Sequence, residues 1–182
     1  YEHIVFDGAA HHSLASHDEL WERSFVVSSF CKTLHATGWN LGYCIAPAHL
    51  SAEFRKIHQF TTFAVSTPMQ HGVADYLAEH PEWCRELPAF YQQKRDLFCD
   101  LMGDSRFRLL PTRSTFFQVL DYGEITDEAD TALAERWTRD IGVASIPLSV
   151  FCREPFTGTR LRFCFGKDDQ TLAEAAQRLR EL

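Results

Sequence analysis

The chain has 182 residues, 45% of them apolar and 13% aromatic, and a formal net charge of -7 at pH 7. This apolar content is sufficient for a packed core. A nucleic acid or an anionic membrane would require a cluster of Lys and Arg, so the acidic balance argues against both as partners. The longest apolar runs, such as Phe25–Val27, are far too short to cross a bilayer. We therefore expect a soluble globular protein of the cytoplasm.

The beginning of the chain and its cysteines set further limits. The sequence opens without an initiator Met and enters an apolar run, His3–Phe6, almost at once, so we expect further sequence in front of Tyr1. Six cysteines, at positions 31, 44, 84, 99, 152 and 164, form no C-x-x-C pair. Neither a zinc site nor a disulfide framework is indicated, and reduced thiols are expected.

The first half of the chain alternates short apolar runs with helical patterns, as in an α/β sheet with both faces covered. The expected strands are His3–Phe6, Phe25–Phe30 and Leu41–Ala46. Ser51 is expected to cap a first helix. Thr67-Pro68 has the form of an N-cap followed by proline at the first helical position, which predicts a second helix that runs to about His80.

The second half begins with a long helix. From Pro81 to Gly103 apolar residues recur at three- or four-residue steps, which predicts an amphipathic helix despite Pro88. This helix would join a first domain, residues 1–83, to a smaller α+β domain, residues 84–182. The elements expected in the smaller domain are strands over Phe107–Leu110, Thr115–Leu120, Val143–Ile146 and Leu161–Phe165, and helices over Asp127–Ile141 and from Asp168 onward.

The most informative stretch runs from Ser28 to Tyr43 and reads SSFCKTLHATGWNLGY. A predicted strand ends in hydroxyl residues, Lys32 follows, and two glycines bracket Trp39 before the next strand. Ser-x-x-Lys alone is a weak signal, because most such lysines are solvated surface groups. The longer pattern, S-x-x-K-T followed by T-G-W-x-x-G-Y, resembles the cofactor-lysine region of class I aminotransferases, most closely the methionine and kynurenine branch.

Two later segments, Ala144–Phe151 and Arg160–Phe165, resemble the C-terminal strand region of the same family in the same order. The resemblance covers essentially the whole chain. It implies the C-terminal part of a fold type I enzyme that uses pyridoxal 5'-phosphate (PLP), with the end of the large domain in residues 1–83 and the small domain in residues 84–182. It also implies a homodimer that transfers an amino group between an amino acid and a 2-oxo acid. The amino acid is expected to be methionine or an aromatic amino acid.

The resemblance assigns roles to individual residues. Lys32 matches the lysine that forms a Schiff base with PLP, which requires a neutral amine. Ser29 matches a hydroxyl that binds the cofactor phosphate, although a serine that caps the turn after a strand is an equally good account. Tyr1 matches the tyrosine that bonds the O3′ phenolate of PLP. Arg162 matches the arginine that grips the substrate carboxylate with two hydrogen bonds, and Arg160 is expected on the same strand face.

Position 40 departs from the family pattern. The resemblance implies Arg or Lys there, as a cation for the cofactor phosphate, and this chain has Asn40. A neutral amide still donates hydrogen bonds, so weaker but not absent PLP binding is expected. The aspartate that pairs with the pyridinium nitrogen would precede Tyr1.

Three alternatives compete with the aminotransferase. A serine acyl transferase, with Ser29 as nucleophile and Lys32 as base, would also need S-x-N and K-T-G elements, which the chain lacks. A metal site at His11, His12 and His17 has no matching carboxylate or cysteine spacing; these histidines lie in a polar segment, residues 8–19, that is expected to be a loop, and loop histidines are the better account. An inactive fragment stays open, because a fold type I active site also uses residues from the N-terminal part and from a second subunit.

Overall fold

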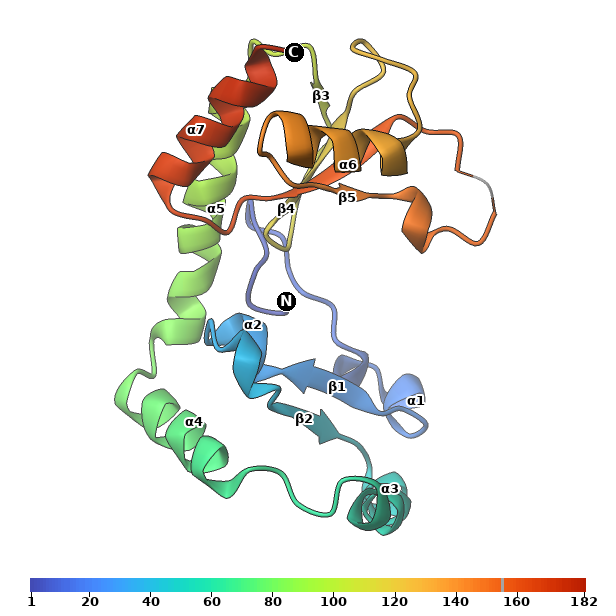
Figure 1. Ribbon diagram of the computed structural model, residues 1–182. Helices are drawn as coiled ribbons and strands as arrows, with labels where there is room; N and C mark the ends of the chain where they lie inside the picture. Colours follow the sequence, from blue (N-terminus) through green and yellow to red (C-terminus); the bar gives the residue numbers. More distant parts are fainter. Residues whose placement is uncertain (155) are drawn as a thin grey trace. The chain divides into compact units, whose positions relative to one another are not determined.

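The computed structural model describes residues 1–154 and 156–182 and divides them into two compact units. Unit 1 comprises Tyr1–His3 and Ala10–Leu87, and unit 2 comprises Ile4–Ala9 and Pro88–Leu182. The elements, most of whose α and β labels appear in Figure 1, are η1 (Leu14–Ser16), α1 (Asp18–Trp21), β1 (Val26–Ser29), α2 (Phe30–Thr33), η2 (Thr37–Trp39), β2 (Gly42–Ile45), α3 (Ala48–Thr61), α4 (Thr67–Glu79), α5 (Trp83–Met102), β3 (Arg108–Leu109), β4 (Phe117–Asp121), α6 (Asp130–Asp140), β5 (Ile146–Pro147), η3 (Ser149–Phe151), β6 (Arg160–Cys164) and α7 (Asp169–Arg180). Among the described residues, none of the helices has the length and apolar character needed to cross a membrane.

Unit 1 is built on two antiparallel strands, β1 and β2, which lie side by side in Figure 1. Val26 lies opposite Ile45, and Ser29 lies opposite Gly42. A side chain on Gly42 would meet the carbonyl oxygen of Ser28 at 2.6 Å, so the close approach of the two strands requires glycine there. The unit leaves large apolar side chains exposed, including Val27 at 74%.

Unit 2 contains a sheet with strand order β3-β4-β6-β5, in which each neighbouring pair is antiparallel. Buried and half-buried residues alternate along β4 and β6, as expected of strands with one face in the core. Helix α6 lies across the sheet and contacts β5 and β6 (Figure 1). Leu120, Leu133, Trp137 and Leu161 are at most 1% exposed. Burial of such side chains, at about 1.5–3 kcal/mol each, makes this core the rigid frame of the unit.

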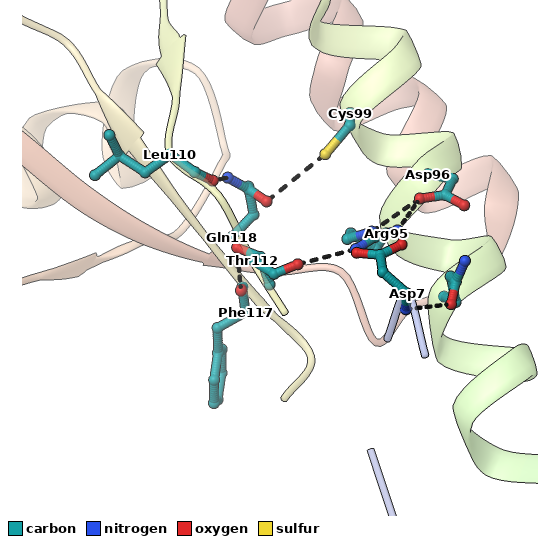
Figure 2. Close-up of polar contacts among 9 residues, drawn as sticks. Asp7, Arg95, Asp96, Cys99, Leu110, Thr112, Phe117 and Gln118 are labelled. Atoms are coloured by element: carbon teal, nitrogen blue, oxygen red, sulfur yellow. Dashed lines mark hydrogen bonds and ion pairs between the residues drawn. The ribbon is translucent and has the colours of Figure 1, made fainter. Parts of the chain in front are cut away.

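Arg95 of α5 joins the N-terminal segment Ile4–Ala9 to the rest of unit 2 (Figure 2). Its Nη1 and Nη2 donate to the Asp7 carboxylate at 2.6 and 2.8 Å, and Nη1 also donates to the carbonyl oxygen of Thr112 at 2.9 Å. Its guanidinium lies 5.0 Å from the ring centroid of Phe6, which is 1% exposed. The hydrogen bonds from Arg95 hold the pKa of Asp7 below its usual value.

The predicted helices are largely confirmed. Helix α4 ends before its C-cap residue His80, as expected, but the expected cap at Thr67 was wrong: Ser66 is the N-cap residue, Thr67 is the first helical residue and Pro68 follows it in the first turn. The long helix is α5, and it contains Pro88 as expected. The closing helix is α7, where Asp168 accepts a hydrogen bond from the backbone of Thr171 at 2.9 Å. The predicted pairing of the two strands after α5 is also confirmed, as β3 and β4.

Two expectations about strands were wrong. His3–Phe6 is not assigned as a strand; within it the structure shows one isolated bridge, from Val5 to Ser114. Ile4 and Phe6 are buried within unit 2, each at 1% exposure, which explains the strand-like pattern. The expected strand over Val143–Ile146 is reduced to β5, which begins at Ile146 and ends at Pro147. Val143 is 7% exposed, which gives the segment its strand-like apolar pattern, but of the four expected residues only Ile146 pairs with β6.

Two expectations about helix starts and loops were also wrong. Ser51 does not cap α3, which begins at Ala48 after Pro47; its hydroxyl donates to the carbonyl oxygen of Ala46 at 2.9 Å inside the first turns. The expected loop over residues 8–19 includes η1 and the start of α1. The hydroxyl of Ser13 caps η1 by accepting a hydrogen bond from the backbone of Ala15 at 3.2 Å.

Candidate functional site

Lys32 lies on α2, a single helical turn that begins where β1 ends. Ser29 is the N-cap residue of this turn, and its Oγ accepts a hydrogen bond from the backbone N–H of Cys31 at 3.2 Å. On the other side of Lys32, the carbonyl oxygen of Thr33 accepts a hydrogen bond from Nε1 of Trp83 at 2.7 Å. The turn that carries the lysine is therefore held at both ends through backbone groups.

Asn40 lies at the same end of the strand pair as Ser29. It is the C-cap residue of η2, two positions before Gly42, which pairs with Ser29. Its backbone is left-handed, with φ 50° and ψ 36°, a conformation in which Asn is favoured over most other residues apart from Gly. Ser29 and Asn40 are both exposed, so their polar groups are accessible to a ligand beside Lys32.

Tyr1 is placed near this end of the strands by its neighbour Glu2. The Glu2 carboxylate accepts hydrogen bonds from the hydroxyls of Ser28 and Tyr43, which lie opposite each other in β1 and β2. Burial alone raises the pKa of Glu2, but the hydrogen bond from Ser28 and further donors lower it to about 2. Burial, together with this carboxylate, raises the pKa of Tyr43. Tyr1, Ser29, Lys32 and Asn40 thus belong to one region of unit 1.

Arg162 lies in β6 of unit 2, opposite Val119 of β4 and Ile146 of β5. Its guanidinium carbon is 4.1 Å from the ring centroid of Phe117 and 5.1 Å from that of Phe151. Its Nε is buried and lacks a hydrogen-bond partner, and within residues 1–154 and 156–182 no carboxylate forms an ion pair with it. A buried guanidinium N–H without a partner is unfavourable, so Arg162 is suited to an anionic ligand.

Arg160 has a different environment. Its Nε also lacks a hydrogen-bond partner among the described residues, but it lies 3.7 Å from Oδ2 of Asp121, close enough for an ion pair. The Asp121 carboxylate accepts hydrogen bonds from Arg108 and Thr159, each at 2.6 Å. Burial alone raises the pKa of Asp121, but the hydrogen bonds from Thr159 and Arg108 lower it to about 2. Arg160 therefore has a carboxylate beside it, which it shares with Arg108, whereas no carboxylate of residues 1–154 and 156–182 forms an ion pair with Arg162.

Two contacts that hold the Lys32 region were not expected from the sequence. Trp83 and Thr33 are 50 residues apart, and Glu2 and Ser28 are 26 residues apart. The sequence signal that could have singled out Glu2 is its place directly before the apolar run His3–Phe6. For the histidines of the N-terminal region, the described part of the chain contains no group of three or more His, Cys, Asp or Glu residues that could hold a metal ion.

Known proteins with the same arrangement identify the family. The family Aminotransferase class I and II matches residues 1–179. The methionine aminotransferase of Escherichia coli (strain K12) is 48% identical over 182 residues, and the kynurenine–oxoglutarate transaminase of Dictyostelium discoideum is 32% identical over 204 residues. The chain belongs to the class I and II aminotransferases. These matches cover 100% of the chain and 47% of each relative, so the chain spans about half the length of the relatives it matches.

Solved structures of aminotransferases have the same fold. A crystal structure of an Escherichia coli protein identified as a methionine aminotransferase matches with a TM-score of 0.96 at 48% identity, over 100% of this chain and 48% of its own. The N-succinyldiaminopimelate aminotransferase from Mycobacterium tuberculosis matches with a TM-score of 0.92 at 32% identity, over 100% of this chain and 47% of its own. The expected fold, the C-terminal part of a fold type I aminotransferase with mixed helices and sheet, is confirmed.

Proposed function

We propose that the whole protein is a PLP-dependent aminotransferase that transfers an amino group between an amino acid and a 2-oxo acid. The main support is the fixed turn of Lys32, which begins at the end of a strand, is capped by Ser29 and is held by Trp83. A lysine that reacts with a cofactor must be presented in a defined position, and rigid supporting contacts provide this. The similarity to the Escherichia coli methionine aminotransferase supports the same class of reaction.

The donor groups near Lys32 fit PLP. Lys32 would provide the amine that bonds to the cofactor aldehyde, and the exposed hydroxyl of Ser29 and amide of Asn40 would bind the phosphate. The phenol of Tyr1 would donate a hydrogen bond to O3′ of PLP. When bound, PLP supplies the electron sink that allows the Cα–H bond of an amino acid to break. Lys32 would then move the proton at Cα.

Arg162 is proposed to bind the α-carboxylate of the substrate. Its uncompensated charge and unpartnered Nε favour an anion, and the planar guanidinium matches a carboxylate through two parallel hydrogen bonds. The rings of Phe117 and Phe151 make its surroundings apolar. This setting supports a substrate with an apolar side chain, methionine or an aromatic amino acid.

The proposed enzyme is a cytoplasmic homodimer, with free amino acids and 2-oxo acids as substrates and with neither nucleic acid nor membrane as a partner. The exposure of Phe60 and Phe63 supports association with a second subunit, because each is 85% exposed and large apolar side chains are usually covered. Light scattering of the purified whole protein tests this proposal. A monomer at micromolar concentration would contradict it.

Borohydride reduction of the whole protein with PLP, followed by peptide mapping, tests the function directly. We expect a pyridoxyl label on Lys32 and its loss in Lys32→Ala. Lys56→Ala is the matched control, because Lys56 is a surface residue paired with Glu53 at 2.7 Å, and it should leave the label in place. A label on a different lysine would contradict the assignment.

The alternative concerns the 182 residues alone. An inactive fragment would bind neither cofactor nor substrate, because the chain spans about half the length of its relatives. Near-visible absorbance after addition of PLP separates the two cases. A cofactor band with the whole protein and none with the isolated chain would restrict the activity to the whole protein.

A further inference from the structure

The ring of Phe151, which contacts Arg162, is carried by a short exposed element. Phe151 ends η3 and is 63% exposed, and Val150 before it is 59% exposed. The backbone N–H of Phe151 donates to the carbonyl oxygen of Leu148 at 3.1 Å, which closes the turn but does not attach it to anything else. Core packing of these side chains is therefore too limited to fix the turn.

Asp130 attaches this turn to the core. One carboxylate oxygen accepts a hydrogen bond from the backbone N–H of Ser149 at 2.8 Å, and the other accepts the Ser149 hydroxyl at 2.7 Å. Asp130 is 6% exposed and lies in the first turn of α6, whose Leu133 and Trp137 are at most 1% exposed. Hydrogen bonds to a buried carboxylate are charge-assisted and shielded from water, so they are strong and directional.

Element η3, held by Asp130, restricts the orientation of the Arg162 guanidinium. The Arg162 guanidinium lies over the rings of both Phe151 and Phe117. Phe117 belongs to β4 and is fixed by the sheet, whereas Phe151 depends on η3. Stacking on aromatic faces favours one orientation of the guanidinium plane, and binding of a carboxylate by two hydrogen bonds depends on that orientation.

We propose that Asp130 is a positioning residue for carboxylate binding, which acts through Ser149 and Phe151 to hold the guanidinium of Arg162 in its binding orientation. This proposal rests on the proposed role of Arg162 as the residue that binds the substrate carboxylate. Asp130 acts through other residues, so its loss affects the binding of carboxylates and leaves turnover at saturating substrate nearly unchanged.

Steady-state kinetics of the whole holoenzyme test this proposal. For Asp130→Asn we expect KM for the amino acid and the inhibition constant of 3-phenylpropionate, a carboxylate without an amino group, to rise together by about 3- to 10-fold. The change in kcat should stay within about twofold. Ser149→Ala, which keeps the backbone hydrogen bond, should give a smaller rise. A fall in kcat with both binding constants unchanged would overturn the proposal.

Glu128→Gln is the matched control for general destabilisation of α6. Glu128 lies two residues before Asp130 and pairs with Arg136 at 2.6 Å. This substitution removes a charged pair at the same helix without touching Ser149, so both binding constants should stay unchanged. An equal rise in Glu128→Gln and Asp130→Asn would show that any loss of helix stability has the same effect, and the proposal would be wrong.

A double-mutant cycle tests whether Asp130 acts through the ring. Phe151→Leu alone should raise the same two constants, and adding Asp130→Asn to it should raise them little further, because the ring that Asp130 holds is already absent. Fully additive effects would overturn the proposal. If Asp130→Asn does not fold, Ser149→Ala in the same cycle decides in the same way.

Arg162→Lys separates a failure of this proposal from a failure of the proposed function. If Arg162→Lys leaves KM and the inhibition constant unchanged, Arg162 does not bind the carboxylate, and both proposals fail. If Arg162→Lys raises both constants but Asp130→Asn and Ser149→Ala do not, the role of Asp130 alone is overturned.

Discussion

Lys32 and Arg162, on which the proposed chemistry depends, are held in different ways. Around Lys32 the support comes through the backbone, from the cap at Ser29 and from the bond between Trp83 and the carbonyl of Thr33. Arg162 stands in a regular strand, and aromatic side chains from other elements support it. The cap at Ser29 is local and leaves a pattern in consecutive residues, whereas the Trp83 contact and the aromatic packing around Arg162 leave none. The difference determines which substitutions are informative in each unit.

The largest effect is expected for Lys32→Ala in the whole protein. Transamination should fall by at least about 100-fold, because a positioned acid–base group contributes about 10²–10⁴-fold. The free energy of unfolding should change by less than about 0.5 kcal/mol, because the contacts that fix the turn use backbone atoms, which the substitution keeps. Loss of transamination together with an unchanged urea unfolding curve would confirm this. A variant that keeps its turnover would show that another group moves the proton.

Arg162→Lys should have the next largest effect. A lysine provides a single point charge and loses the stacked plane, so KM for the amino acid and for the 2-oxo acid should both rise by about 10- to 100-fold. The control is Arg160→Lys, because Arg160 already has the Asp121 carboxylate beside it, at 3.7 Å from its Nε. An unchanged KM with lower turnover would assign Arg162 a role other than carboxylate binding.

The two regions were not equally predictable from the sequence. Ser29 and Lys32 could be singled out because hydroxyl residues, a lysine and glycines follow one another at a strand end. Asp130 and Ser149 are 19 residues apart and meet only after α6 has folded against the sheet, so no local pattern pairs them. The contact between Trp83 and Thr33 has the same long-range origin.

The fold shows a similar limit. Helices α4, α5 and α7 could be predicted within a few residues, because apolar periodicity over three or more turns is a strong signal. Short strands carry a weaker signal: β5 has two residues, and its second residue is Pro147. His3–Phe6 is apolar because Ile4 and Phe6 are buried in unit 2, each at 1% exposure, and not because the segment pairs along its length.

Asn40 tests whether local backbone geometry explains a departure from the family pattern. In Asn40→Arg the affinity for PLP should rise by about 5- to 30-fold, because a charge-assisted hydrogen bond to phosphate exceeds a neutral one by about 1–2 kcal/mol. The free energy of unfolding without cofactor should fall by about 1 kcal/mol, because the backbone at φ 50° is unfavourable for arginine. Equilibrium titration with PLP and urea unfolding measure the two quantities.

Asn40→Gly is the matched control for that prediction. Glycine tolerates the left-handed backbone and lacks the amide, so the affinity for PLP should fall while the free energy of unfolding stays nearly unchanged. If wild type and Asn40→Arg bind PLP equally within about twofold, the phosphate is already neutralised by another cation, and the weaker binding expected from Asn40 is wrong.

A smaller effect is expected at Asp121, whose charge contributes to the stability of unit 2. Its pKa falls from 3.8 to about 2, because hydrogen bonds from Thr159 and Arg108 outweigh the effect of burial. The folded state therefore binds this proton less readily than the unfolded state. The resulting stabilisation is complete above about pH 5 and is lost as the pH falls through about 2. Asp121→Asn should remove this part of the acid dependence, about 1 kcal/mol after solvent screening, in urea unfolding at several pH values. An unchanged acid slope would contradict it.

A similarly small effect on stability is expected for Trp83→Phe, which tests the backbone support of the Lys32 turn. Phenylalanine keeps an aromatic ring beside His35 and Tyr76, whose ring centroids lie 5.5 and 5.6 Å from that of Trp83. It cannot donate to the carbonyl oxygen of Thr33, a residue that is 7% exposed. The loss of one such hydrogen bond should lower the free energy of unfolding by about 1 kcal/mol.

The same substitution should also lower kcat by about 2- to 5-fold with little change in KM, because the turn that presents Lys32 becomes less rigid while Arg162 is unaffected. Tyr76→Phe is the control: it alters the ring next to Trp83 and leaves the bond to the turn intact, so kcat should stay normal. If Trp83→Phe lowers stability but not kcat, the cap at Ser29 is sufficient to fix the lysine. The backbone support of Lys32 would then come from one contact, and its contrast with the packed side chain of Arg162 would be weaker than the structure indicates.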